Sequence, residues 1–130
     1  AQVGRLGYTR RMLSVPFSVD LGISSVQGIL RLEAEALAID WRPYSLLDEP
    51  TGELSTLVIP YARLASATYR NRLGRGRITV VAHAAAAFRG FPLPNGSIAT
   101  LPATVKRRDR PEAEAWCAEA ALRIAEHDEG

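Results

Sequence analysis

Hydrophobic and polar residues alternate along much of this chain, a period of two that is typical of half-buried β-strands. The clearest example is segment 28–41, where apolar side chains recur at every second position on both sides of Ala34-Glu35. A two-residue hairpin turn fits at Ala34-Glu35, although neither residue is the Gly or Asn that such turns favour. A continuous helix is the alternative, because Leu, Glu and Ala are good helix formers. We prefer the hairpin because the alternation holds on both sides of the turn.

Further short strands are expected before and after this hairpin. Segment 15–21 alternates in the same way, and Pro16 favours an edge or entry position there. The other expected strands are 57–61, 65–69, 77–82, 97–101 and 103–107, of which the last two form either two strands or one strand interrupted at Pro102. Residues typical of turns separate them, notably in loops at 43–52 and 91–96 and in a hairpin tip at 70–76.

The end of the chain changes to a spacing of three and four residues, which predicts an amphipathic helix over about 110–127. Asp109 is expected to cap its first turn, with Glu112 as the reciprocal partner of a capping box. Glu119 and Arg123 form a favourable pair one turn apart. The expected buried side of the helix consists of Ala113, Trp116, Cys117, Ala120, Ile124 and Ala125. Several strands followed by one helix predict a mainly β fold, a small barrel or sandwich with the helix packed across an opening.

The length and composition fit one domain. The chain has 130 residues, enough for one core and too few for two comfortable domains. Residues 1–11 are basic, contain Gly and offer little to bury, so we expect a flexible arm there and a single domain over 12–130. Cys117 is the sole cysteine, which excludes an internal disulfide and favours a reducing, cytoplasmic location. No apolar run approaches the roughly 20 residues that span a bilayer, and we expect no transmembrane segment.

Four sequence segments and the helix carry a family resemblance. The segments are Gly28-Ile-Leu-Arg-Leu-Glu, Leu37-Ala-Ile-Asp-Trp, Ile59-Pro-Tyr-Ala-Arg-Leu-Ala and Thr104-Val-Lys-Arg-Arg-Asp-Arg. Together with the Ala- and Glu-rich helix, they resemble bacterial pleckstrin-homology-like domains over about residues 15–127. The resemblance implies a bent sandwich of about seven antiparallel strands with the helix closing one end. The resemblance does not imply lipid-headgroup recognition. The basic loop of the eukaryotic members follows their first strand, whereas the comparable basic segment here is 70–77, in a different part of the chain.

Charge is distributed unevenly, although the net charge is only +2. Segment 54–108 contains no acidic residue at all. Its nine basic residues are Arg63, Arg70, Arg72, Arg75, Arg77, Arg89, Lys106, Arg107 and Arg108. Acidic residues predominate before and after this interval, so an acidic–basic–acidic layout underlies the modest total.

The four arginines of segment 70–77 are the candidate binding residues: Arg70, Arg72, Arg75 and Arg77. They are either a solvated hairpin tip or a docking site for an anionic surface, whether a lipid, a nucleic acid or an acidic protein. The absence of acidic neighbours favours docking, because the field over this region stays positive. The segment lacks the Lys-Ser/Thr of a phosphate-binding nucleotide loop.

Other chemistries have weaker support in the sequence. His83, His127 and Cys117 show no metal-ligand spacing, so we expect no metal and no cofactor. No nucleophile motif is present, and we expect no catalysis. Nucleic acid is not expected either, because the alternation points Trp41 inward instead of toward a base. The function that we expect is a non-catalytic module for protein–protein interaction or self-association. Weak docking to an anionic membrane surface is the first alternative, and a small enzyme is the second.

Overall fold

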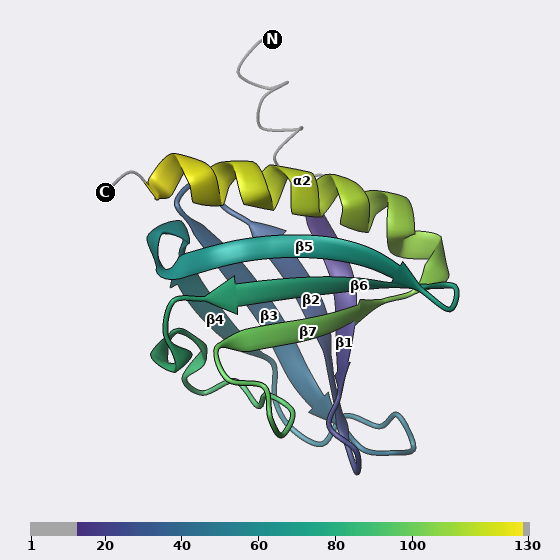
Figure 1. The fold of residues 1–130 in the computed structure, drawn as a ribbon. Helices are drawn as coiled ribbons and strands as arrows, with labels where there is room; N and C mark the ends of the chain where they lie inside the picture. The colour runs from purple at the N-terminus through teal and green to yellow at the C-terminus, as the bar shows by residue number, and fades with distance from the viewer. Residues whose placement is uncertain (1–12, 129–130) are drawn as a thin grey trace, which may run out of the picture.

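Seven antiparallel strands form one sheet, and one long helix follows them (Figure 1). The computed structural model describes residues 13–128. The strands are β1 (Ser14–Asp20), β2 (Ser25–Leu32), β3 (Ala36–Tyr44), β4 (Ser55–Pro60), β5 (Leu64–Arg72), β6 (Arg75–Ala82) and β7 (Thr100–Val105), and the helix is α2 (Arg110–His127). The expected mainly β fold with a C-terminal helix is confirmed. The expected arm at 1–11 lies outside the described residues.

The sheet is bent into two groups of strands. Its order is β4-β3-β2-β1-β7-β6-β5, and the two groups join where Ser18 of β1 pairs with Thr104 of β7. In Figure 1, β5, β6 and β7 cross in front of β1–β4, and α2 lies along the top of both groups. Inward-pointing side chains of the two groups meet α2 in one core, whose largest fully buried members include Trp116, Tyr61, Leu30 and Ile59.

The hairpin expected over 28–41 is confirmed as β2 and β3, with Leu32 opposite Leu37 and the turn at Ala34-Glu35. Neither turn residue adopts a positive φ, which explains why the turn forms without Gly or Asn. Gly28 has a separate role. A side chain on Gly28 would overlap the backbone of Asp40 in β3, so the two strands approach closely there only because this residue is Gly.

Two details of the strand predictions change in the structure. β1 is an interior strand of the sheet and not an edge, but Pro16 lies near its start, away from the Ser18–Thr104 pair that joins β1 to β7. The missing N–H of Pro16 therefore falls at the entry to the strand, where proline is tolerated. β7 is a single strand that runs through Pro102, which lies opposite Thr79.

The helix α2 is confirmed, but the predicted capping box at its start is wrong. Asp109 makes no side-chain capping hydrogen bond. A short 3₁₀ turn, η3 (Arg107–Asp109), runs directly into α2 and gives Asp109 a ψ of 6°, whereas a capping residue is usually extended. The Asp109 carboxylate lies 3.9 Å from Arg108 instead. Of the expected buried side of the helix only Ala125 is exposed.

Candidate functional site

The four candidate arginines project from one side of the β5–β6 hairpin. Arg70 lies directly opposite Arg77, and Arg72 lies opposite Arg75. Because side chains alternate across a strand, all four point the same way. The next inward residue of β6, Ile78, is fully buried, while the four arginines are exposed on the outer side of the sheet. The sequence placed them in a hairpin tip, but they lie on the strands themselves, and only Leu73 and Gly74 form the turn.

The two facing pairs of arginines destabilise the β5–β6 hairpin. Like charges directly across a strand pair repel one another, and here two such pairs stand side by side. None of the ion pairs found within residues 13–128 involves any of the four arginines. Their charges therefore remain available to a ligand from outside the domain.

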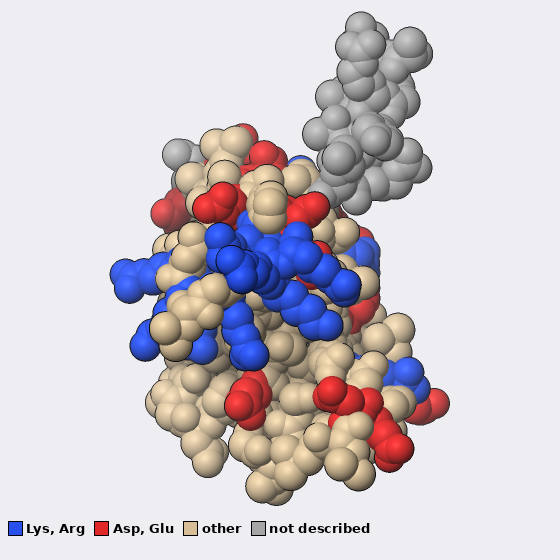
Figure 2. All heavy atoms as spheres, turned by 90° about the vertical axis from the view of Figure 1, so that its right-hand side faces the viewer, with Lys and Arg blue, Asp and Glu red and all other residues tan. Residues whose placement is uncertain are grey.

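The strand β7 brings further cations to the same side. Arg77 of β6 lies opposite Thr104 of β7, and the exposed side chain of Lys106 follows two residues later. Arg107 and Arg108 are exposed in the 3₁₀ turn that comes next. We call the whole group the basic surface, which consists of Arg70, Arg72, Arg75, Arg77, Lys106, Arg107 and Arg108. Figure 2, which views the molecule from the right-hand side of Figure 1, shows Lys and Arg gathered in a continuous cluster on this side.

An exposed apolar residue marks the tip of the hairpin. The side chain of Leu73 is 99% exposed. Its φ of 51° and the φ of 83° at Gly74 form a tight turn in the left-handed region, which Asn, Asp or Gly ordinarily occupies. The Arg110 guanidinium, at the start of α2, donates a hydrogen bond of 3.2 Å to the Gly74 carbonyl and ties the tip to the helix. The turn therefore holds a leucine in a strained and solvated position.

A trough of about 740 Å³ borders the basic surface. It runs over the outer side of the sheet, with Arg75, Lys106 and Arg108 on the side of β6 and β7. On the β3 side it is lined by Tyr44, Asp48 and Leu54, and Asp20 also lines it. Arg42 lies on this side too, where its guanidinium donates a hydrogen bond of 2.8 Å to the Gly52 carbonyl. The trough thus has a basic side and a mostly acidic, partly apolar side. A partner with a flat surface would not enter the trough, whereas a segment of a protein chain could fill it.

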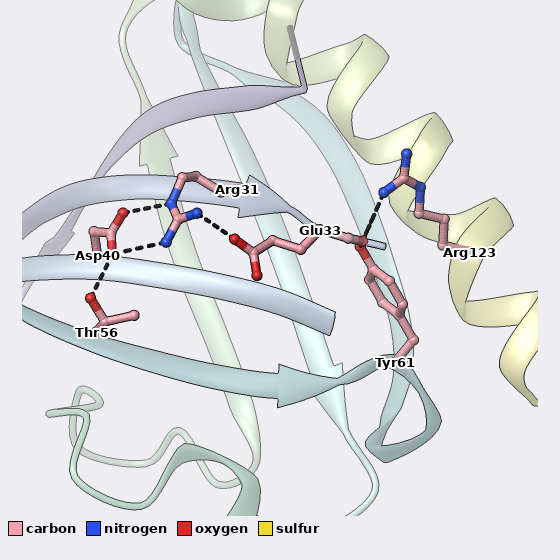
Figure 3. Close-up of polar contacts among 6 residues, drawn as sticks. All are labelled: Arg31, Glu33, Asp40, Thr56, Tyr61 and Arg123. Carbon is pink, nitrogen blue, oxygen red and sulfur yellow. Dashed lines mark hydrogen bonds and ion pairs between the residues drawn. The ribbon is translucent and has the colours of Figure 1, made fainter. Parts of the chain in front are cut away.

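The polar cluster on the outer side of β2 and β3 has a structural role (Figure 3). Arg31 donates two hydrogen bonds to Asp40, of 2.6 and 3.3 Å, and Thr56 donates a third of 2.7 Å. The hydrogen bond from Arg31 is the main reason why the pKa of Asp40 lies below its usual value. Since the carboxylate is ionised and occupied by these donors, it is not available as a general base.

A second polar group in Figure 3 fastens α2 to the β2–β3 turn. Tyr61 and Arg123 both donate hydrogen bonds to the carbonyl of Glu33, of 2.6 and 2.8 Å. Arg123 also pairs with Glu119 at 2.8 Å, as the sequence predicts. These contacts give the Tyr61 hydroxyl and the Arg123 guanidinium hydrogen-bond partners. They also hold the C-terminal part of α2 against the β2–β3 turn.

Cys117, His127 and His83 are the remaining candidates for chemistry, and each has different surroundings. Cys117 is buried, and burial raises the pKa of its thiol to about 12, so the nucleophilic thiolate is scarce at neutral pH. His127 lies 3.2 Å from Glu35, while His83 is on the surface. Within residues 13–128, no group of three or more His, Cys, Asp or Glu side chains is arranged to hold a metal ion. No helix in the described part of the chain is long and apolar enough to cross a membrane.

The sequence singled out four of the seven cations of the basic surface as candidate binding residues. Lys106, Arg107 and Arg108 were part of the same acid-free interval, but their position beside the hairpin depends on the pairing of β6 with β7. Leu73 and the trough were missed. A two-residue turn at Leu73-Gly74 would have predicted from the sequence that Leu73 is exposed to solvent. The trough depends on the bend of the whole sheet, so no local sequence pattern predicts it.

Comparison with known proteins adds no identification. No family model, no curated protein and no solved structure matches this chain. The likeness to pleckstrin-homology-like domains therefore rests on the sequence segments alone and stays a prediction.

Proposed function

We propose that this domain is a non-catalytic binding module that attaches to an acidic protein partner through its basic surface. The observation that carries the proposal is the pairing of Arg70 with Arg77 and of Arg72 with Arg75. A hairpin that only needed to be soluble would not place like charges directly opposite one another, because each pair costs stability. Partner carboxylates would remove that cost.

The type of cation supports a protein partner. Six of the seven members of the basic surface are arginines. A guanidinium forms two parallel hydrogen bonds to a carboxylate and is more weakly hydrated than an ammonium group, which suits a protein interface. The trough beside the basic surface gives a partner segment a shaped place to lie, as in other protein interfaces.

The expected affinity is modest. Exposed ion pairs contribute up to about 1 kcal/mol each, so seven of them with ordinary geometry supply roughly 4 kcal/mol. That value corresponds to a dissociation constant of about 1 mM. Burial of Leu73 against a partner adds about 2 kcal/mol, and the dissociation constant falls to tens of micromolar.

A labelled oligoglutamate peptide tests the proposal, with oligoglutamine as the uncharged probe. We expect fluorescence anisotropy to report binding of the first peptide and not the second, and binding should weaken steeply as salt shortens the Debye length. The variant Arg75→Ser/Arg77→Ser should weaken it about tenfold or more. Arg63→Ser/Arg89→Ser removes the same charge from two exposed arginines outside the basic surface and serves as the matched control. Equal loss in both variants would show that net charge alone, and not this surface, binds the peptide.

Leu73 favours a second candidate function, attachment to an anionic membrane surface. A leucine between Arg72 and Arg75 can enter the lipid interface while the arginines meet the headgroups. Each cation near an anionic leaflet contributes about 1 kcal/mol. Co-sedimentation with vesicles of anionic and of neutral lipid tests this, with Leu73→Ser and the Arg75→Ser/Arg77→Ser variant. A membrane-binding module requires both variants to lose binding to anionic vesicles. If the wild type leaves anionic vesicles unbound at low salt, this candidate function is excluded.

A further inference from the structure

Exposed apolar side chains gather in the loops farthest from α2. Ile23 lies in the β1–β2 turn and is 84% exposed. In the connection from β3 to β4, Leu46, Leu47 and Leu54 are 72, 81 and 65% exposed. Isolated exposed apolar residues are ordinary, but several in neighbouring loops indicate an interaction site.

These loops lie side by side and carry acidic residues as well. Ser25, just after the first turn, pairs with Tyr44, just before the second connection, and Gln27 donates a hydrogen bond of 3.4 Å to Asp48. Figure 1 shows both connections at the bottom of the molecule, at the end opposite α2. Their acidic residues are Asp20, Asp48, Glu49 and Glu53. We call this group of apolar and acidic residues the loop end.

The trough connects the loop end with the basic surface. Asp48 and Leu54 of the loop end and Arg75 and Lys106 of the basic surface line the same hollow. One continuous side of the domain therefore has a basic half and an acidic, apolar half. Figure 2 shows acidic side chains below the cluster of Lys and Arg on this side.

We propose that this side binds a second copy of the same chain about a twofold axis, so that the basic surface of each copy lies against the loop end of the other. The inference rests on the proposed function and names the acidic partner. A twofold rotation exchanges the two halves of the interface, so a side with one basic and one acidic half is complementary to itself. The same rotation brings Leu73 of each copy toward the exposed leucines of the other.

A second copy explains both halves of this side, whereas a separate acidic partner explains only one. The loop end is acidic and apolar, so it adds no favourable charge contact with a separate acidic protein or with an anionic membrane. A closed twofold dimer also needs no further copies, whereas a head-to-tail contact between two different surfaces would continue from copy to copy into a ring or a filament.

Two charge reversals and their mixture test the inference. The variant Arg75→Glu/Arg77→Glu lowers the charge of the basic surface from +7 to +3, and Glu49→Arg/Glu53→Arg removes the net charge of the loop end, from −4 to 0. The four replaced residues are exposed, so both variants should fold. Each reversed residue occurs twice in a twofold interface. We therefore expect either variant alone to dimerise about a hundredfold more weakly than the wild type.

Sedimentation velocity at low salt is the measurement, and the equimolar mixture of the two variants is the decisive sample. The mixture should dimerise more tightly than either variant alone, because the carboxylates introduced in one variant then lie against the guanidinium groups introduced in the other. A wild type that stays monomeric at the highest attainable concentration would overturn the inference. So would a variant that dimerises as well as the wild type, or a mixture that stays monomeric.

The oligoglutamate assay separates this inference from the proposed function. The Glu49→Arg/Glu53→Arg variant keeps the basic surface, so it should still bind the peptide. If the wild type is monomeric and this variant binds the peptide, the self-association fails while the proposed function stands. If this variant, whose basic surface is not covered by a second copy, does not bind the peptide at low salt, the proposed function itself fails.

Discussion

Trp116 is the residue whose loss should damage this fold most. It is the largest of the fully buried side chains, 1% exposed, on the side of α2 that faces the sheet. Replacing a buried Trp by Ala costs about 3–5 kcal/mol, a large part of the 5–15 kcal/mol that holds a typical domain folded. We therefore expect Trp116→Ala to leave the domain close to unfolding.

The shift in melting temperature follows from the length of the chain. Unfolding entropy near the midpoint is about 2.1 cal/mol/K per residue, or roughly 0.27 kcal/mol/K for the 130 residues of this chain. A loss of 3–5 kcal/mol then lowers Tm by about 11–18 °C. Scanning calorimetry or circular dichroism measures it, with Leu122→Ala as the control on the exposed side of α2, where the shift should stay within a few degrees.

A second substitution separates the volume of Trp116 from its polar atom. The indole Nε1 is buried without a hydrogen-bond acceptor among the described residues, and such an unpaired donor costs about 1–3 kcal/mol. Trp116→Phe removes that donor along with part of the ring, so its Tm should lie much closer to the wild type than that of Trp116→Ala. If Trp116→Ala itself melts within about 3 °C of the wild type, α2 does not close the core, and our account of the fold is wrong.

Three further predictions follow from single residues. Arg77→Thr should stabilise the fold by roughly 0.2–1 kcal/mol, seen as a higher Tm, because it removes one like-charge cross-strand pair, and it should weaken peptide binding. Cys117 should react with a thiol reagent far more slowly in the native than in the unfolded protein, because burial raises its pKa to about 12; equal rates would contradict its burial. The Arg123 carbonyl and then Glu35 raise the pKa of His127. Its contribution to stability is therefore full below about pH 6.5 and lost as pH rises through the folded-state pKa. Glu35→Gln should lower that pKa in an NMR titration.

Local patterns predicted most of the elements of this fold. The alternation on both sides of Ala34-Glu35 was enough to find β2, β3 and their turn, because one face of each strand is buried. The three- and four-residue spacing of Trp116, Ala120 and Ile124 was enough to find α2. The predicted cap at Asp109 failed because a 3₁₀ turn precedes the helix, and residues 107–109 carry no pattern that distinguishes such a turn from an extended segment.

The site was harder to predict than the fold because it depends on contacts between distant segments. The arginines between 70 and 77 were identified from their charge alone, but the turn residues Gly74 and Gly76 led us to place them in a wide tip. Gly76 lies within β6 instead, where any side chain would meet the ring of Tyr69. The approach of Lys106 to the hairpin depends on the pairing of β6 with β7, and the trough depends on the bend of the sheet; no local pattern records either.

An NMR titration of the labelled protein with oligoglutamate tests the central claim most directly, because it shows where an acidic ligand binds. We predict that shifts concentrate in the β5–β6 hairpin and in residues 104–110, that the Arg70–Arg77 and Arg72–Arg75 pairs are among the most affected, and that added salt reverses them. Shifts spread evenly over the exposed arginines, including Arg63 and Arg89, or no shifts at low salt, would contradict the assignment of the basic surface as the binding site.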